Sequence, residues 1–151
     1  SYNNLGDAVL AGVESELAWR PDSRFRTFLR HRWLHARDLE HDRALLNRAP
    51  QRLVAGLRLT LPAGLSAGAE VDYRSSKVVE YYDLDDGQYH YADDRGRALF
   101  HARLRYDHGF LAGFTGWVML SGRNLLDTHY EDGSFEPRPG RELWLTVGAD
   151  L

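Results

Sequence analysis

The chain of 151 residues contains no cysteine, so it cannot form a disulfide framework, a zinc ribbon or a thiol nucleophile. It has no run of about 20 apolar residues and no apolar segment after a basic start, which excludes a spanning helix and a signal peptide. Its mean hydropathy of -0.50 excludes a helical membrane protein. A transmembrane barrel is still allowed, because its strands alternate between apolar and polar residues and average out as polar.

No strong excess of either charge is present. The 19 basic and 22 acidic residues give a net charge of -3. A nucleic-acid-binding protein usually carries an excess of basic residues, so we predict no nucleic-acid partner. The sequence also contains no set of nucleophile, base and orienting group, and no glycine loop that would hold a phosphate. We therefore predict that the protein is not an enzyme and needs no cofactor.

Alternating apolar and polar residues predict seven strands. In the last one, Leu143, Leu145 and Val147 fall on one face, while the intervening residues are mostly polar. The same period of two runs through all seven predicted strands, which cover residues 8–19, 24–38, 53–61, 65–73, 98–106, 114–120 and 143–151.

The connections between these strands alternate in length. Those at 20–23, 62–64 and 107–113 are short, while those at 39–49, 76–97 and 127–140 are long. A membrane barrel has tight turns at its periplasmic rim and long loops at its extracellular rim, and its strands need roughly 9 to 11 residues to cross the bilayer. Aromatic residues near strand ends on the apolar faces fit an interfacial girdle: Trp19, Trp33, Tyr73 and Tyr106.

Two motifs near the end of the chain carry a family resemblance: GRNLLDTHYE, beginning at Gly122, and RPGRELWL, beginning at Arg138. They resemble the C-terminal end of TonB-dependent outer-membrane receptors, and weaker similarity extends over essentially the whole chain. The matching positions are Asn124, Leu125, Asp127, Tyr130, Pro139, Gly140 and Arg141. Asn124 and Asp127 are predicted to cap a turn through bonds between side chain and backbone.

The resemblance implies an all-β, antiparallel, up-and-down transmembrane β-barrel segment of about seven strands that belongs to a larger barrel. It implies a bacterial outer-membrane location and the import of a scarce nutrient, a ferric siderophore first, or cobalamin or another chelate. We expect residues 1–151 to be the C-terminal part of such a receptor, without its plug domain. The implied partners are outer-membrane lipid, the receptor's own plug and remaining strands, the TonB complex through the missing N-terminal part, and a metal-chelate ligand.

The candidate ligand-binding residues lie on the polar faces and in the long connection 76–97. The arginines could bind an anionic chelate or the plug, since guanidinium groups form forked bonds to carboxylates; the alternative is a solvated wall laced with weak ion pairs. The connection 76–97 is predicted to be an extended loop whose tyrosines and acids favour a neutral or zwitterionic ligand. These candidates are Arg30, Arg32, Arg58, Arg74, Arg103, Tyr81, Tyr82, Tyr89 and Tyr91.

A metal site is not predicted. His31 and His35 lie about 13 Å apart along a strand, which is too far for joint coordination. Two other interpretations of the whole chain are a small soluble or membrane barrel that binds an apolar ligand, as lipocalins do, and a purely structural outer-membrane protein. In the lipocalin-like case the apolar face would line the interior.

Overall fold

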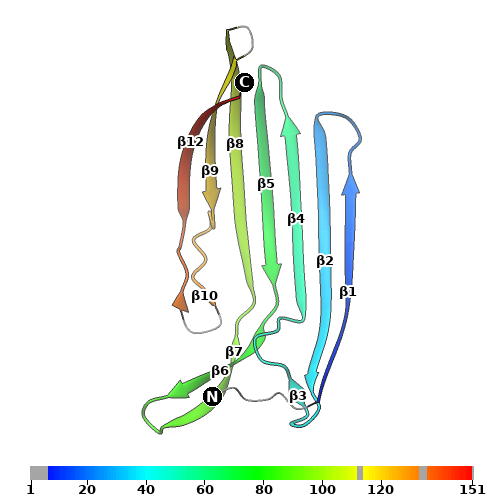
Figure 1. Cartoon of the computed structure of the whole chain (residues 1–151), viewed down its shortest axis with the longest axis vertical. Coiled ribbons are helices and arrows are strands. Elements are labelled where there is room, and N and C mark those ends of the chain that lie inside the picture. The colour runs from blue at the N-terminus through cyan, green and yellow to red at the C-terminus, as the bar shows by residue number, and fades with distance from the viewer. Residues whose placement is uncertain (1–6, 112–113, 133–135, 151) are drawn as a thin grey trace.

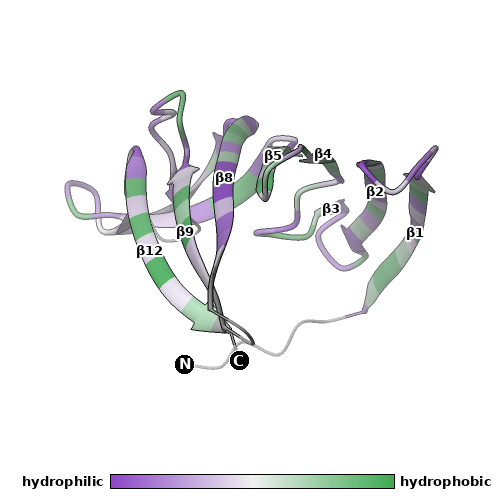
Figure 2. Cartoon of the chain, turned by 90° about the horizontal axis from the view of Figure 1, so that it is seen from above, coloured by the Kyte–Doolittle hydropathy of each residue, from purple (hydrophilic) through white to green (hydrophobic). Residues whose placement is uncertain are grey.

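The computed structural model describes residues 7–111, 114–132 and 136–150. Seven long strands form one antiparallel sheet in the order β1-β2-β4-β5-β8-β9-β12, so each is joined to the next one along the sheet (Figure 1). Figure 2 shows this sheet as a curved wall with β1 and β12 at its two ends. The strands are β1 (Ala8–Trp19), β2 (Phe25–Asp38), β4 (Gln51–Thr60), β5 (Leu65–Arg74), β8 (Arg97–Leu111), β9 (Phe114–Arg123) and β12 (Glu142–Asp150).

The remaining strands are short and lie in the long connections. β3 (Arg43–Ala44) pairs with the end of β2, β6 (Lys77–Asp83) pairs with β7 (Gln88–Asp94), and β10 (Glu131–Asp132) pairs with β11 (Glu136–Pro137). The described part of the chain contains no helix that is long and apolar enough to cross a membrane.

The strand register gives the sheet one apolar and one polar face. Leu29 is opposite Leu17 on β1 and Ala55 on β4, and Ala55 is in turn opposite Val71 on β5. The apolar face continues along β8, β9 and β12, and many of its large side chains are exposed; Leu145 and Val147 are each 70% exposed. Among the described residues only Leu45 and Val79 are buried hydrophobics. In the described part of the chain the sheet thus has no internal core, and its apolar face is left exposed.

Short and long connections lie at opposite ends of the sheet, as predicted (Figure 1). In the turn between β1 and β2, the Asp22 carboxylate accepts hydrogen bonds from the N–H groups of Arg24 and Phe25, each at 2.8 Å. In the turn between β4 and β5, Ala63 and Gly64 have φ values of 61° and 76°. Local residues thus shape both turns, and the Gly64 carbonyl also accepts a hydrogen bond from the Asp107 N–H at 2.9 Å.

The predicted turn over 107–113 is too long. Residues 107–109 pair with 115–117, and β8 extends to Leu111, so the strands continue through most of this segment. Asp107, His108 and Gly109 are weak strand formers in isolation. Pairing with β9 overrides this local preference, which the sequence pattern alone does not reveal. The β8 strand consequently has 15 residues.

The connection 76–97 is not the extended loop that we predicted, because most of it forms the hairpin of β6 and β7. The strands pair from Lys77 opposite Asp94 to Asp83 opposite Gln88. Valine and tyrosine have high strand propensity, and Gly87 takes the left-handed φ of 70° in the turn. The many acidic residues in this segment favour a loop, and for that reason the sequence pattern alone did not predict the two strands.

The hairpin packs against the connection between β2 and β4. Buried Leu45 and Val79 belong to these two segments, and the Asn47 N–H donates to the Val78 carbonyl at 2.8 Å. The guanidinium carbon of Arg43 lies 4.4 Å from the centre of the Tyr91 ring. At the end of the sheet that carries the long connections, two of them therefore form one packed unit.

Candidate functional site

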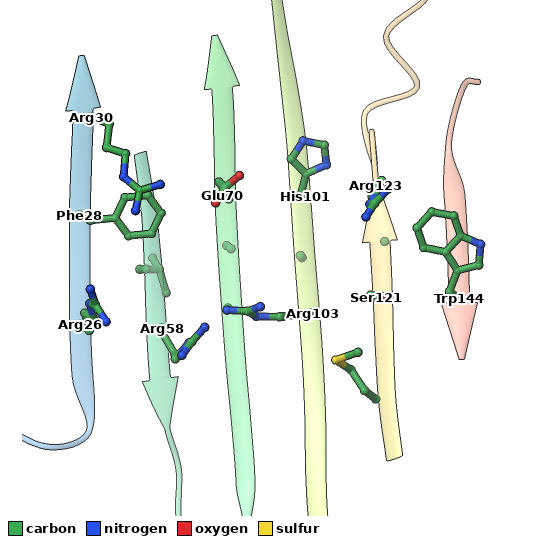
Figure 3. Close-up of a pocket in the computed structure, with 16 residues that line it drawn as sticks. Arg26, Phe28, Arg30, Arg58, Glu70, His101, Arg103, Ser121, Arg123 and Trp144 are labelled. Atoms are coloured by element: carbon green, nitrogen blue, oxygen red, sulfur yellow. The ribbon is translucent and has the colours of Figure 1, made fainter. Parts of the chain in front are cut away.

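The polar face contains a hollow of about 530 Å³ that spans six adjacent strands, β2, β4, β5, β8, β9 and β12 (Figure 3). Basic and aromatic side chains line it, together with several neutral residues and the carboxylate of Glu70. Three of the five predicted arginines are among them: Arg30, Arg58 and Arg103. Several other lining residues are not among the predicted ligand-binding residues: Arg26, Phe28, Glu70, His101, Ser121, Arg123 and Trp144.

Three arginines form a row across the hollow. Arg26 on β2 is directly opposite Arg58 on β4, Arg58 is opposite Gly68 on β5, and Gly68 is opposite Arg103 on β8. A Cβ atom added to Gly68 would lie 3.0 Å from the Arg103 Nε, so the Arg103 side chain lies over this glycine. Figure 3 shows the Arg58 and Arg103 side chains extending toward one another.

This row has no ion-pair partner within the described part of the chain. Arg30 is the exception among the arginines of the hollow, since its Nε lies 3.5 Å from a Glu16 oxygen, an exposed pair. Like charges directly opposite one another in a sheet destabilise it. The row from Arg26 to Arg103 is therefore a cationic surface whose internal repulsion an anionic group would relieve.

A second arginine row lies nearer the long connections, and one carboxylate, that of Asp72, neutralises part of its charge. Arg32 is opposite Arg52, Arg52 is opposite Arg74, and Arg74 is opposite Arg97. Arg52 forms a forked pair with Asp72, at 3.0 and 2.7 Å, and an Arg74 nitrogen lies 3.9 Å from the same carboxylate. The predicted ligand-binding residues Arg32 and Arg74 belong to this row and do not line the hollow.

Aromatic side chains flank the unpaired row. The guanidinium carbon of Arg30 lies 4.9 Å from the centre of the Phe28 ring, and that of Arg123 lies 4.6 Å from the centre of the Trp144 ring. Trp144 was assigned to the polar face from the alternation alone, but its contact with Arg123 depends on the register between β9 and β12. The hollow therefore combines guanidinium groups with flat aromatic surfaces.

The Phe28 ring occupies space that Gly56 leaves open. A Cβ atom at position 56 would lie 2.6 Å from two carbons of that ring. We expect Gly56→Ala to lower the free energy of unfolding by about 1 to 2 kcal/mol, as overpacking does. Urea titration of single and double variants measures this. The penalty should largely disappear in Phe28→Ala, and an equal penalty in both backgrounds would contradict the packing role of the ring.

The four predicted tyrosines lie on the hairpin, not in the hollow. Tyr82 and Tyr89 form an edge-to-face pair with ring centres 5.1 Å apart, and Tyr81 lies 5.7 Å from the His90 ring. Tyr91 stacks on Arg43, as described above. The predicted arginines thus lie on the polar face of the sheet, whereas the predicted tyrosines lie on the β6–β7 hairpin at the end of the sheet.

The turn of the hairpin brings His90 against a carboxylate. His90 Nε2 lies 2.7 Å from an Asp86 oxygen, and the Gln88 N–H donates to the other Asp86 oxygen at 2.9 Å. These two contacts hold the pKa of the Asp86 carboxyl below its ordinary value, with the imidazole contributing most. Asp86 is therefore an ionised carboxylate already placed beside an imidazole.

Asn124 caps the turn after β9, as predicted, whereas the side chain of Asp127 bonds to a residue outside this turn. The Asn124 side chain donates to the Thr128 carbonyl and accepts from the Thr128 N–H, both at 2.9 Å. Asp127 accepts a hydrogen bond from the Arg141 N–H at 2.8 Å, which joins this turn to the entry of β12.

The other motif residues surround this corner. The Leu125 N–H donates to the Phe100 carbonyl at 2.9 Å, and the Arg97 guanidinium lies 4.3 Å from the centre of the Tyr130 ring. A Cβ atom at Gly140 would lie 2.5 Å from the Asp127 carboxylate, so a larger residue at position 140 would displace that side chain. Pro139 is exposed next to it.

Solved structures share this fold. The ferripyoverdine receptor of the outer membrane of Pseudomonas aeruginosa bound to ferripyoverdine superposes with a TM-score of 0.74 at 13% identity, over 93% of this chain and 19% of that one. The FpvAI–pyocin S2 complex gives 0.75 at 14%, with the same coverage. The copper transporter OprC gives 0.69 at 16%, over 93% of this chain and 23% of that one.

No family model matches the sequence, and no curated protein matches it. The chain spans about a fifth of the length of the receptor structures that it matches. The predicted fold class, an antiparallel segment of a receptor β-barrel, is confirmed. The resemblance to TonB-dependent outer-membrane receptors is thus confirmed in the fold.

Proposed function

We propose that residues 1–151 form part of the barrel wall of a bacterial outer-membrane receptor that imports a metal chelate, a ferric siderophore in the first instance. The apolar face contacts lipid, and the polar face lines the interior. The missing parts of the receptor are the remaining strands, a plug domain and the segment that receives energy from the TonB complex. The solved neighbours support an outer-membrane location and a transport function for a barrel of this kind.

The row of Arg26, Arg58 and Arg103 is the observation that carries the proposal. The three arginines have no ion-pair partner among the described residues of the polar face, so an anion bound there would relieve their mutual repulsion. A chelate with carboxylate or catecholate groups supplies such an anion. Carboxylate groups of the plug domain are the other candidate source of the anion that pairs with these arginines. A lipocalin-like interior is disfavoured, because the hollow lies on the cationic face and not on the apolar face.

The experiment measures ligand binding by the full-length receptor in detergent, with ferric siderophores as ligands. We expect Arg58→Gln and Arg103→Gln each to weaken binding about tenfold, which corresponds to about 1.4 kcal/mol for one lost charge-assisted bond. Arg24→Gln is the matched control, because it removes the same charge from an exposed position in the turn after β1.

Each outcome separates the alternatives. Unchanged ligand affinity with a lower free energy of unfolding would assign the row to the plug. If neither quantity changes, the row is a solvated wall and does not bind an anion. A receptor that binds no chelate at all, in a well-folded barrel, would favour the structural outer-membrane protein.

A further inference from the structure

Three metal-ligand side chains converge at the turn of the β6–β7 hairpin. Asp83 ends β6, Asp86 lies in the turn, and His90 lies on β7. One ligand atom from each residue lies within 4.8 Å of the other two. The turn itself is closed by the Gly87 N–H, which donates to the Asp83 carbonyl at 3.0 Å.

The carboxylates in this cluster are oriented before any ion arrives. Asp83 accepts a bond from the Asp85 N–H at 2.8 Å, and Asp86 accepts one from the Gln88 N–H at 2.9 Å. The second Asp86 oxygen faces His90 Nε2 at 2.7 Å. Backbone bonds to a ligating carboxylate fix its orientation in the same way as the outer partners of known metal sites do.

The presence of His90 distinguishes this cluster from an ordinary solvated acidic loop. An imidazole and two carboxylates suit Zn²⁺ and Cu²⁺, whereas Ca²⁺ and Mg²⁺ prefer oxygen ligands alone. Residues 77–94 also contain six acids (Glu80, Asp83, Asp85, Asp86, Asp93 and Asp94) and one lysine, so the hairpin attracts cations.

We propose that Asp83, Asp86 and His90 bind a divalent transition-metal ion, Cu²⁺ or Zn²⁺, on the hairpin. Bonds of about 2.0 to 2.2 Å place neighbouring ligand atoms of a tetrahedral site about 3.3 Å apart. Side-chain rotation in the exposed turn closes the remaining separation. The ion takes the place of the hydrogen bond between His90 and Asp86, and water fills the fourth position. The site is independent of the barrel's own ligand.

The test titrates Cu²⁺ into the full 151-residue chain in detergent micelles, purified with a tag that contains no histidine. Electron paramagnetic resonance at one equivalent should show a single site with nitrogen coupling from one imidazole. His90→Gln should remove this signal, and Asp83→Asn and Asp86→Asn should each weaken binding at least about tenfold.

His41→Gln is the matched control, because His41 Nδ1 also lies near one carboxylate oxygen, that of Asp38 at 2.9 Å, yet belongs to no group of three ligands in the described part of the chain. It should leave the signal unchanged. A site that survives His90→Gln, or that His41→Gln removes equally, would overturn the proposal. So would the absence of a site in a chain whose circular dichroism shows the expected strand content. If the chain lacks that content, the intact receptor takes its place in the same titration.

Discussion

Replacing Val71 with arginine is expected to lower the free energy of unfolding by about 2 to 4 kcal/mol when the full-length barrel is embedded in lipid. Val71 lies in the middle of β5 on the apolar face, opposite Ala55 and Phe100, and is 38% exposed. An arginine there must leave water for hydrocarbon. Urea-driven unfolding in phospholipid vesicles measures the loss.

Val54→Arg provides a matched control. It makes the same change on the neighbouring strand and at nearly the same height, but on the polar face, opposite Asp72 and Arg30. We expect its cost to stay below about 1 kcal/mol, because the charge remains in water beside a carboxylate. Equal losses in the two variants would show that the apolar face does not contact lipid, and the barrel assignment of this wall would then be wrong.

The two faces of the sheet and the short turns could be predicted because they depend on local patterns. Alternation places Leu143, Leu145 and Val147 together whatever their neighbours are, and proline, glycine and aspartate mark turns through their own backbone preferences. The cap at Asn124 is similarly local, because its side chain bonds to Thr128. These features need no knowledge of which strand lies beside which.

The arginine rows could not be predicted in this way, because they depend on register. Arg26, Arg58 and Arg103 are far apart in the sequence, and a shift of one strand by two residues would keep every face while breaking the row. The contacts of Trp144 with Arg123 and of Phe28 with the space above Gly56 depend on the same register. The cluster of Asp83, Asp86 and His90 was missed for a related reason, since it exists only when residues 77–94 form a hairpin.

Loss of the Asn124 side chain is expected to be the most damaging change at the corner after β9. Asn124 is only 3% exposed and has a φ of 48°, which asparagine tolerates better than most residues. Its amide satisfies both the N–H and the carbonyl of Thr128. We expect Asn124→Ala to lower the free energy of unfolding of the full-length barrel by about 2 to 4 kcal/mol, because two backbone groups lose their partner and alanine is strained at this φ.

Asn124→Gly separates the two contributions, because glycine adopts a positive φ without strain but supplies no amide. It should recover about 1 kcal/mol relative to alanine and still remain less stable than the wild type. Hydrogen exchange at the Thr128 amide should accelerate in both variants, since the exchange rate reports whether that N–H is bonded. Wild-type stability in Asn124→Gly would mean that the corner depends on the backbone conformation alone. Unchanged Thr128 exchange in both variants would show that the hydrogen bonds from Asn124 do not close the turn after β9.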